Sequence, residues 1–141
     1  MNRTKTILGS LVLFVGVCGC GDTPAKVIRD IYSTRNEMAD MLFLANDEDT
    51  AKYCAEVKVE RLKKKWETVK KRYEDYLGDK EYKRDMKAAY LENKAEYDAT
   101  DRRVQLGIQR LERLRGPSMG RLIGSAQTGF TFSPDVILQA K

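Results

Sequence analysis

The chain has 141 residues, with 26 Lys and Arg, 21 Asp and Glu and no His, so its formal net charge is +5. Without histidine it cannot build a Ser-His-Asp triad, a Cys-His pair, a histidine-ligated zinc site or an ordinary haem site. A chain of this length is expected to form one domain.

The first 20 residues have the pattern of an export signal. Arg3 and Lys5 give a positive start, and an uncharged, mostly apolar run follows over 7–17. A helix needs about 20 apolar residues to cross a membrane. The run is therefore too short to span and is typical of the apolar part of a secretory signal peptide.

The run ends in Val17-Cys18-Gly19-Cys20, which resembles the lipobox of bacterial lipoproteins. The resemblance implies that Val17 is the aliphatic position, Cys18 the tolerant position, Gly19 the small residue before cleavage and Cys20 the lipid acceptor. Cys18 departs from the pattern, since Ala, Ser or Thr is more usual there. Another register would place the lipid on Cys18, but bulky Val17 would then precede the cleavage site, so we favour Cys20.

This resemblance implies a signal peptide at 1–19 and a lipidated Cys with a short linker at 20–23. Acyl chains supply about 0.8 kcal/mol per buried CH₂, and several chains anchor a protein stably. We therefore expect a membrane-anchored protein of the cell envelope that faces the periplasm or the outside. An ordinary signal peptide or a buried N-terminal helix is the alternative. Removing 1–19 leaves 24 basic and 21 acidic side chains, which gives +3 and weakens any argument for a nucleic-acid partner.

Processing would also leave Cys54 as the one unmodified cysteine, so no disulfide could form within the mature chain. A single exported cysteine is either a small packed apolar group, or an intermolecular disulfide or reactive thiol.

The span 24–116 reads as an all-α domain, because 25–116 lacks proline and is rich in good helix formers. We predict a first helix that begins with Thr23 as N-cap and Pro24 at its first position. It ends near Asn46-Asp47, either of which could cap the next helix. Its apolar residues recur at helical spacing on one stripe: Val27, Ile28, Ile31, Met38, Met41, Leu42 and Ala45.

A second helix is predicted over 48–77, with the strongest periodic signal in the chain. Apolar residues alternate in steps of 4 and 3, as in a coiled-coil seam. The seam consists of Ala55, Val59, Leu62, Trp66, Val69, Tyr73 and Tyr76. Gly78 is predicted to end the helix as a left-handed residue, and Asp79 to cap the next helix.

A third helix is predicted over 80–115, where Gly116-Pro117 stops it. Tyr90, Tyr97, Val104 and Leu111 recur every seven residues, and a companion row at the same period holds Met86, Asn93, Thr100, Gly107 and Leu114. The row contains small and polar residues, and Gly107 would allow close approach of a neighbouring helix. We predict an elongated antiparallel helical hairpin or three-helix bundle with coiled-coil-like packing.

The segment 117–141 differs in composition, with three charges among Gly, Ser and apolar residues. Two interpretations remain open. It is a poorly ordered tail, or it docks on the bundle or on a partner because its apolar groups are costly to leave in water.

No catalytic, cofactor or metal site is expected, since no convergent residues have the required spacing. The acids at 47–49 lack the glycine and later ligands of a calcium loop. The basic triplets at 63–65 and 70–72 could touch anionic lipid or wall polymers, but their interleaved acids favour the solvated flank of a helix. Tyr73, Tyr76, Tyr90 and Tyr97 could bind a ligand, although their heptad placement favours the core.

The sequence NEMADML at 36–42, followed by DEDTAK at 47–52, is similar to small uncharacterised bacterial lipoproteins, and that resemblance carries no activity. The combination of an expected lipid anchor, long helices and a terminal Lys141 also resembles murein lipoproteins, in which a C-terminal lysine is joined to peptidoglycan. An ordinary C-terminus is the alternative. The expected partners are the membrane and a protein or cell-wall polymer. We predict a non-enzymatic structural or interaction lipoprotein, with a ligand-binding or sensory module on the aromatic seam as the alternative.

Overall fold

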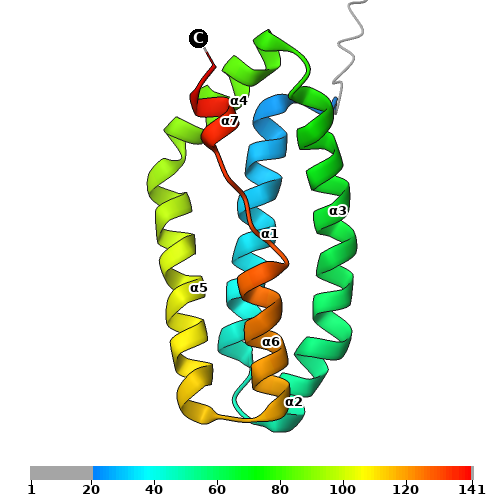
Figure 1. Ribbon diagram of the computed structural model, residues 1–141, viewed down its shortest axis with the longest axis vertical. Coiled ribbons are helices and arrows are strands. Elements are labelled where there is room, and N and C mark those ends of the chain that lie inside the picture. The colour runs from blue at the N-terminus through cyan, green and yellow to red at the C-terminus, as the bar shows by residue number, and fades with distance from the viewer. Residues whose placement is uncertain (1–20, 141) are drawn as a thin grey trace, which may run out of the picture.

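The computed structural model describes residues 21–140, which form a helical bundle and contain no strand (Figure 1). The all-α prediction is therefore confirmed. In chain order the helices are α1 (Pro24–Leu44), α2 (Glu48–Tyr53), the π-helix η1 (Cys54–Lys58), α3 (Val59–Tyr76), α4 (Lys80–Glu92), α5 (Lys94–Leu114), α6 (Pro117–Thr128) and α7 (Asp135–Leu138). Helix α1 packs between α3 and α5, and α6 lies along the bundle as a fourth long element.

The predicted start of α1 is confirmed. The Thr23 hydroxyl accepts a hydrogen bond from the Lys26 backbone N–H at 3.2 Å, and Pro24 occupies the first turn. The predicted apolar stripe of α1 is buried. It meets α5 at Gly107, where an added Cβ would lie 2.6 Å from the Leu42 Cβ, so the close approach predicted at Gly107 is present.

The second predicted helix is continuous from α2 to α3, but it contains a π-turn that the sequence pattern did not indicate. The Val59 N–H donates to the Cys54 carbonyl, five residues earlier. Cys54 and Val59 are both fully buried, whereas Ala55, which the seam predicted in place of Cys54, is only half-buried. The π-turn inserts one residue so that both positions reach the core.

The remainder of the predicted seam is confirmed. Its central residues are buried and its last two are half-buried against the core: Val59, Leu62, Trp66, Val69, Tyr73 and Tyr76. This places the aromatic end of the seam in the half of the bundle where the described chain begins (Figure 1).

The break at Gly78 is present, but its predicted left-handed conformation is wrong. Within 21–140, no glycine adopts a left-handed backbone conformation. Leu77 instead keeps a right-handed helical conformation, and the Asp79 N–H donates to the Tyr76 carbonyl at 3.3 Å. The chain then restarts as a helix because the Asp79 carboxylate caps α4, accepting from the backbone N–H of Glu81 at 2.7 Å.

The third predicted helix is two helices, α4 and α5, which meet at Asn93. Its side-chain amide donates to the Ala89 carbonyl at 2.7 Å, where its own backbone N–H also donates at 3.3 Å. Such competition by a short polar side chain disfavours a regular helix. Asn93 leaves helical geometry at φ −105° and ψ 13°, and α4 therefore turns across the end of the bundle (Figure 1).

The predicted stop at Gly116-Pro117 is present, and a side chain from α2 reinforces it. Arg115 has a φ of 54°, in the range that favours glycine, whereas Gly116 is extended. The Glu48 carboxylate passes so close to Gly116 that a Cβ there would clash. It accepts from the Ser118 backbone N–H at 2.8 Å and so caps α6, where a negative charge is favourable.

The C-terminal segment docks on the bundle, so the second of the two interpretations left open is the one observed. Phe130 is 1% exposed and meets Trp66 edge-on, with ring centroids 6.1 Å apart. Arg35 donates to the Phe130 carbonyl at 2.6 Å, and the Tyr97 hydroxyl donates to the Phe132 carbonyl at 3.2 Å. Helix α7 then packs on α4, so the segment closes one side of the bundle.

Candidate functional site

The residues predicted to be processed and lipidated lie outside the described part of the chain. These are Val17, Cys18, Gly19 and Cys20, and the terminal Lys141 lies outside it as well. The structure begins one residue after the predicted lipid acceptor, so it describes how the domain holds the chain next to that position.

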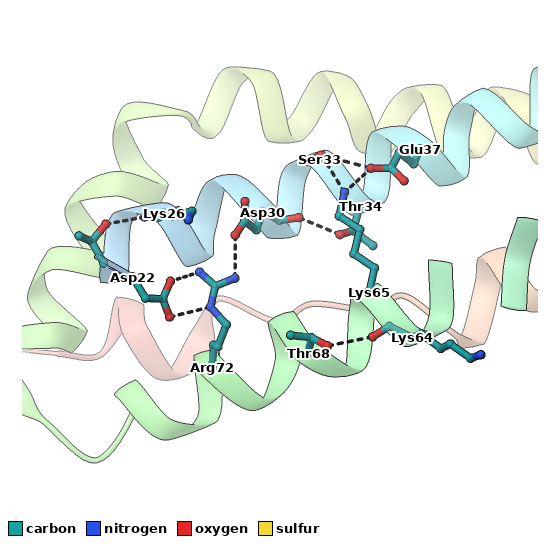
Figure 2. A network of polar contacts seen from close by, with 11 residues as sticks. Asp22, Lys26, Asp30, Ser33, Thr34, Glu37, Lys64, Lys65, Thr68 and Arg72 are labelled. Atoms are coloured by element: carbon teal, nitrogen blue, oxygen red, sulfur yellow. Dashed lines mark hydrogen bonds and ion pairs between the residues drawn. The ribbon is translucent and has the colours of Figure 1, made fainter. Parts of the chain in front are cut away.

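Asp22 is clamped to the bundle. The Arg72 guanidinium donates to both carboxylate oxygens of Asp22 and, at 2.7 Å, to Asp30 on α1 (Figure 2). These hydrogen bonds lower the pKa of Asp22, and the two carboxylates raise the pKa of Arg72. Bidentate arginine–carboxylate pairs fix geometry as well as charge, so Asp22 is tied to both α1 and α3.

The clamp lies at one end of the molecule. The described chain enters there, α3 ends there, and α4, α7 and the C-terminal end gather at the same end (Figure 1). Two extended residues span at most about 7 Å. A group attached at Cys20 would therefore be held within a short distance of this end.

The aromatic seam, the alternative ligand site predicted from the sequence, is filled by the protein itself. Phe132 packs against Tyr73 and Tyr97 with ring centroids 5.3 and 5.8 Å apart, and Tyr97 packs against Tyr32 at 5.1 Å. Burial raises the pKa of Tyr32 and Tyr73. A hollow of about 180 Å³ beside Trp66 is below the roughly 300 Å³ at which ligand pockets begin, whereas one of about 400 Å³ lies where Tyr97 and Phe132 meet Arg35 and Asp101.

The basic triplets mostly form ion pairs with neighbouring acids. Lys63 pairs with Glu60 at 2.7 Å, and Lys65 pairs with Glu37 across to α1. Arg72 belongs to the clamp. This is the arrangement expected of the solvated flank of an amphipathic helix, which the sequence favoured.

The acidic cluster at 47–49 has a structural role. Asp47 forms a capping box with Thr50, which lowers the pKa of Asp47, and Glu48 caps α6. Within residues 21–140, no group of three potential metal ligands comes together.

Sequence reasoning missed a groove between α1 and α3, with a volume of about 570 Å³. Its apolar lining consists of Met41, Leu44 and Leu62, of which Leu44 alone is exposed, and its cationic lining includes Lys58 of η1 and Arg61 of α3. The volume falls within the roughly 300–1,000 Å³ of ligand sites. The one signal in the sequence was a pair of cations, three residues apart, beside the apolar seam.

The groove lies at the π-turn. Lys58 is the last residue of η1 and precedes the fully buried Val59. Its ammonium lies 6.0 Å from the centroid of the Tyr53 ring, which is 49% exposed. π-Turns are frequent at functional sites, and this one sets the wall of the groove.

The comparisons do not connect the chain to a known protein. No protein-family model, curated protein or solved structure matches it. Within residues 21–140, none of the helices combines the length and apolar character needed to cross a membrane.

Proposed function

We propose that this chain is a lipid-anchored protein of the cell envelope that acts by contact with a partner rather than by catalysis. The observation that carries the proposal is the Asp22 clamp, two residues after the lipid acceptor inferred at Cys20. A flexible linker would leave the domain free to tumble. A clamped start instead holds the end formed by α4 and α7 towards the membrane and the α2–α6 end away from it.

The packing supports a contact role over the alternative ligand-binding role of the aromatic seam. Phe132 fills the space among the tyrosines, and the segment that carries it is tied down by Arg35 and Tyr97. The α1–α3 groove, with a volume of about 570 Å³, lies in the half of the bundle away from the clamp.

Metabolic labelling with an alkyne fatty acid tests the anchor. The wild-type chain and the Cys18→Ser variant should both be labelled, and the Cys20→Ser variant should not. Labelling that survives in Cys20→Ser but is lost in Cys18→Ser would move the acceptor. Absence of label from the wild type would overturn the lipid anchor.

A further inference from the structure

The connection between α5 and α6 is short and strained. Helix α5 ends at Leu114 and α6 begins at Pro117, so the chain reverses direction over Arg115 and Gly116 (Figure 1). Arg115 adopts φ 54° and ψ 134°, and within 21–140 it is the one residue other than glycine with a positive φ. This combination lies outside the small left-handed region that residues with a Cβ tolerate. The adjacent glycine, which could adopt such a backbone at little cost, is extended instead.

Packing on both sides of the connection imposes this conformation. Helix α6 packs back on α5 and on α2. Its first turn is held by Glu48, which accepts from the Ser118 N–H at 2.8 Å, and its second turn by the Arg121–Glu56 ion pair at 3.2 Å. Backbone strain of this kind persists only where the surrounding structure enforces it. It corresponds to a factor of roughly 5–150 in an equilibrium constant, which opening of the connection would release.

The segment that follows the connection cannot simply detach. Leu122, Phe130 and Ile137 are each at most 1% exposed. Exposing three such side chains to water costs more than the strain at one residue releases. The segment 117–140 can therefore leave its own bundle only if an equivalent surface covers it, and a second copy of this chain offers that surface with the same residues.

We propose that two copies of the chain exchange residues 117–140. Each segment packs on the body of the other copy, residues 21–114, and Arg115 and Gly116 form the hinge. Exchange of an identical element reproduces its contacts between chains, and a short, strained hinge favours such an exchange. This inference rests on the proposed contact role and names its partner, a second copy.

The proposed anchor brings the two copies together in the orientation that the exchange needs. The Asp22 clamp lies at one end of the bundle, and the hinge lies at the opposite end (Figure 1). Two copies anchored in one membrane therefore present their hinges at the same height. A two-fold axis along the membrane normal relates them, as in most dimers of identical chains.

A crosslink between the segment and the body distinguishes the exchanged dimer from the closed chain. Glu56 and Arg121 contact each other from the body and the segment, with half-exposed side chains, so Glu56→Cys/Arg121→Cys should cost little stability. Cys54 is buried and does not compete for the reagent. A short bis-maleimide is added to the envelope fraction that holds the full-length gene product. On a denaturing gel, exchange yields a covalent dimer, whereas a closed chain yields an internally crosslinked monomer.

Two controls separate exchange from collision. The single variants Glu56→Cys and Arg121→Cys should each form at least about tenfold less covalent dimer than the double variant. In the double variant, adding Arg115→Gly should lower the ratio of dimer to monomer at least about fivefold, because glycine relieves the strain of the closed hinge. Arg115→Ala removes the same charge but keeps the Cβ, so it should change the ratio by less than about twofold.

Circular dichroism verifies that each variant keeps its helical content. Crosslinked monomer without dimer, equal dimer in the single and double variants, or equal effects of Arg115→Gly and Arg115→Ala would overturn the inference. The gel can be read in whichever fraction holds the chain, and fatty-acid labelling at Cys20 does not depend on it. A failure of the exchange is therefore distinguishable from a failure of the anchor.

Discussion

Replacing Phe130 by Ala tests whether the C-terminal segment is part of the bundle. The ring is 1% exposed, meets Trp66 edge-on and follows α6 directly in the chain. Truncating a buried Phe to Ala costs about 3–5 kcal/mol, and this range includes the roughly 0.5–1.5 kcal/mol of an edge-to-face pair. The segment can move to fill part of the space, which places the expected loss near the lower limit, about 3 kcal/mol.

Thermal denaturation followed by far-UV circular dichroism measures this loss. For a domain of this size about 3 kcal/mol corresponds to a fall in Tm of roughly 10 °C. Trp66, now 6% exposed, would also lose its cover, so its emission should move to longer wavelength.

Val136→Ala is the matched control, because Val136 belongs to the same segment but is 49% exposed. Its Tm should stay within about 2 °C of wild type, as for most surface changes. If Phe130→Ala also melts within 2 °C of wild type with unchanged Trp66 emission, the reasoning that places this segment in the core is refuted.

Three further outcomes are expected. Gly107→Ala should destabilise the fold by about 1–2 kcal/mol in urea titrations, because overpacking against Leu42 outweighs the gain in helix propensity. Gly120→Ala has open space around it, so the same gain in helix propensity should stabilise the fold by about 0.5–1 kcal/mol. Cys54 is buried with a raised pKa, so a thiol reagent should modify it only on unfolding; fast modification of the native protein would disprove its burial. Arg72 lowers the pKa of Asp22 in the folded state. The contribution of this ion pair to folding stability is therefore complete above about pH 4, and it is lost as the pH falls through the lowered pKa of Asp22. The Tm difference between wild type and Arg72→Met should therefore shrink as the pH falls below about 4, and a difference that stays constant down to about pH 2 would exclude this linkage.

Local signals were sufficient for most of the helices. Thr23-Pro24 marks the start of α1 because a hydroxyl cap and a first-turn proline act within one turn. The steps between Leu62, Trp66 and Val69 place these side chains on one helix face whatever packs against them. Such features depend on neighbouring residues alone, so the sequence carries them.

The features that were missed depend on distant partners. The heptad spacing predicts that Ala55, four residues before Val59, is the buried position. The π-turn buries Cys54 instead, and no residue pattern near Cys54 indicates this turn. An asparagine such as Asn93 is compatible both with a polar heptad position in a continuous helix and with a break between two helices, so the sequence does not distinguish them. The docking of Phe130 requires Trp66, which lies far away in the sequence.

The candidate site divides in the same way. The proposed lipid-acceptor motif is contiguous, so the sequence alone suggests it, whereas the groove requires α1 and α3 to be side by side. Arg61 looked like one more cation among many. Its distinction is that the nearby acids are already paired, Glu37 with Lys65 and Asp40 with Arg103, and only the folded structure reveals this.

The most direct test of the anchored-contact account is the intact mass of the full-length gene product, extracted from the envelope fraction of a bacterium that processes lipoproteins. The account predicts a chain that begins at Cys20, carries a diacylglyceryl group on its sulfur and stays with the membrane fraction. A mass that corresponds to an unmodified chain, whether it begins at Met1 or after a different cleavage, would contradict it.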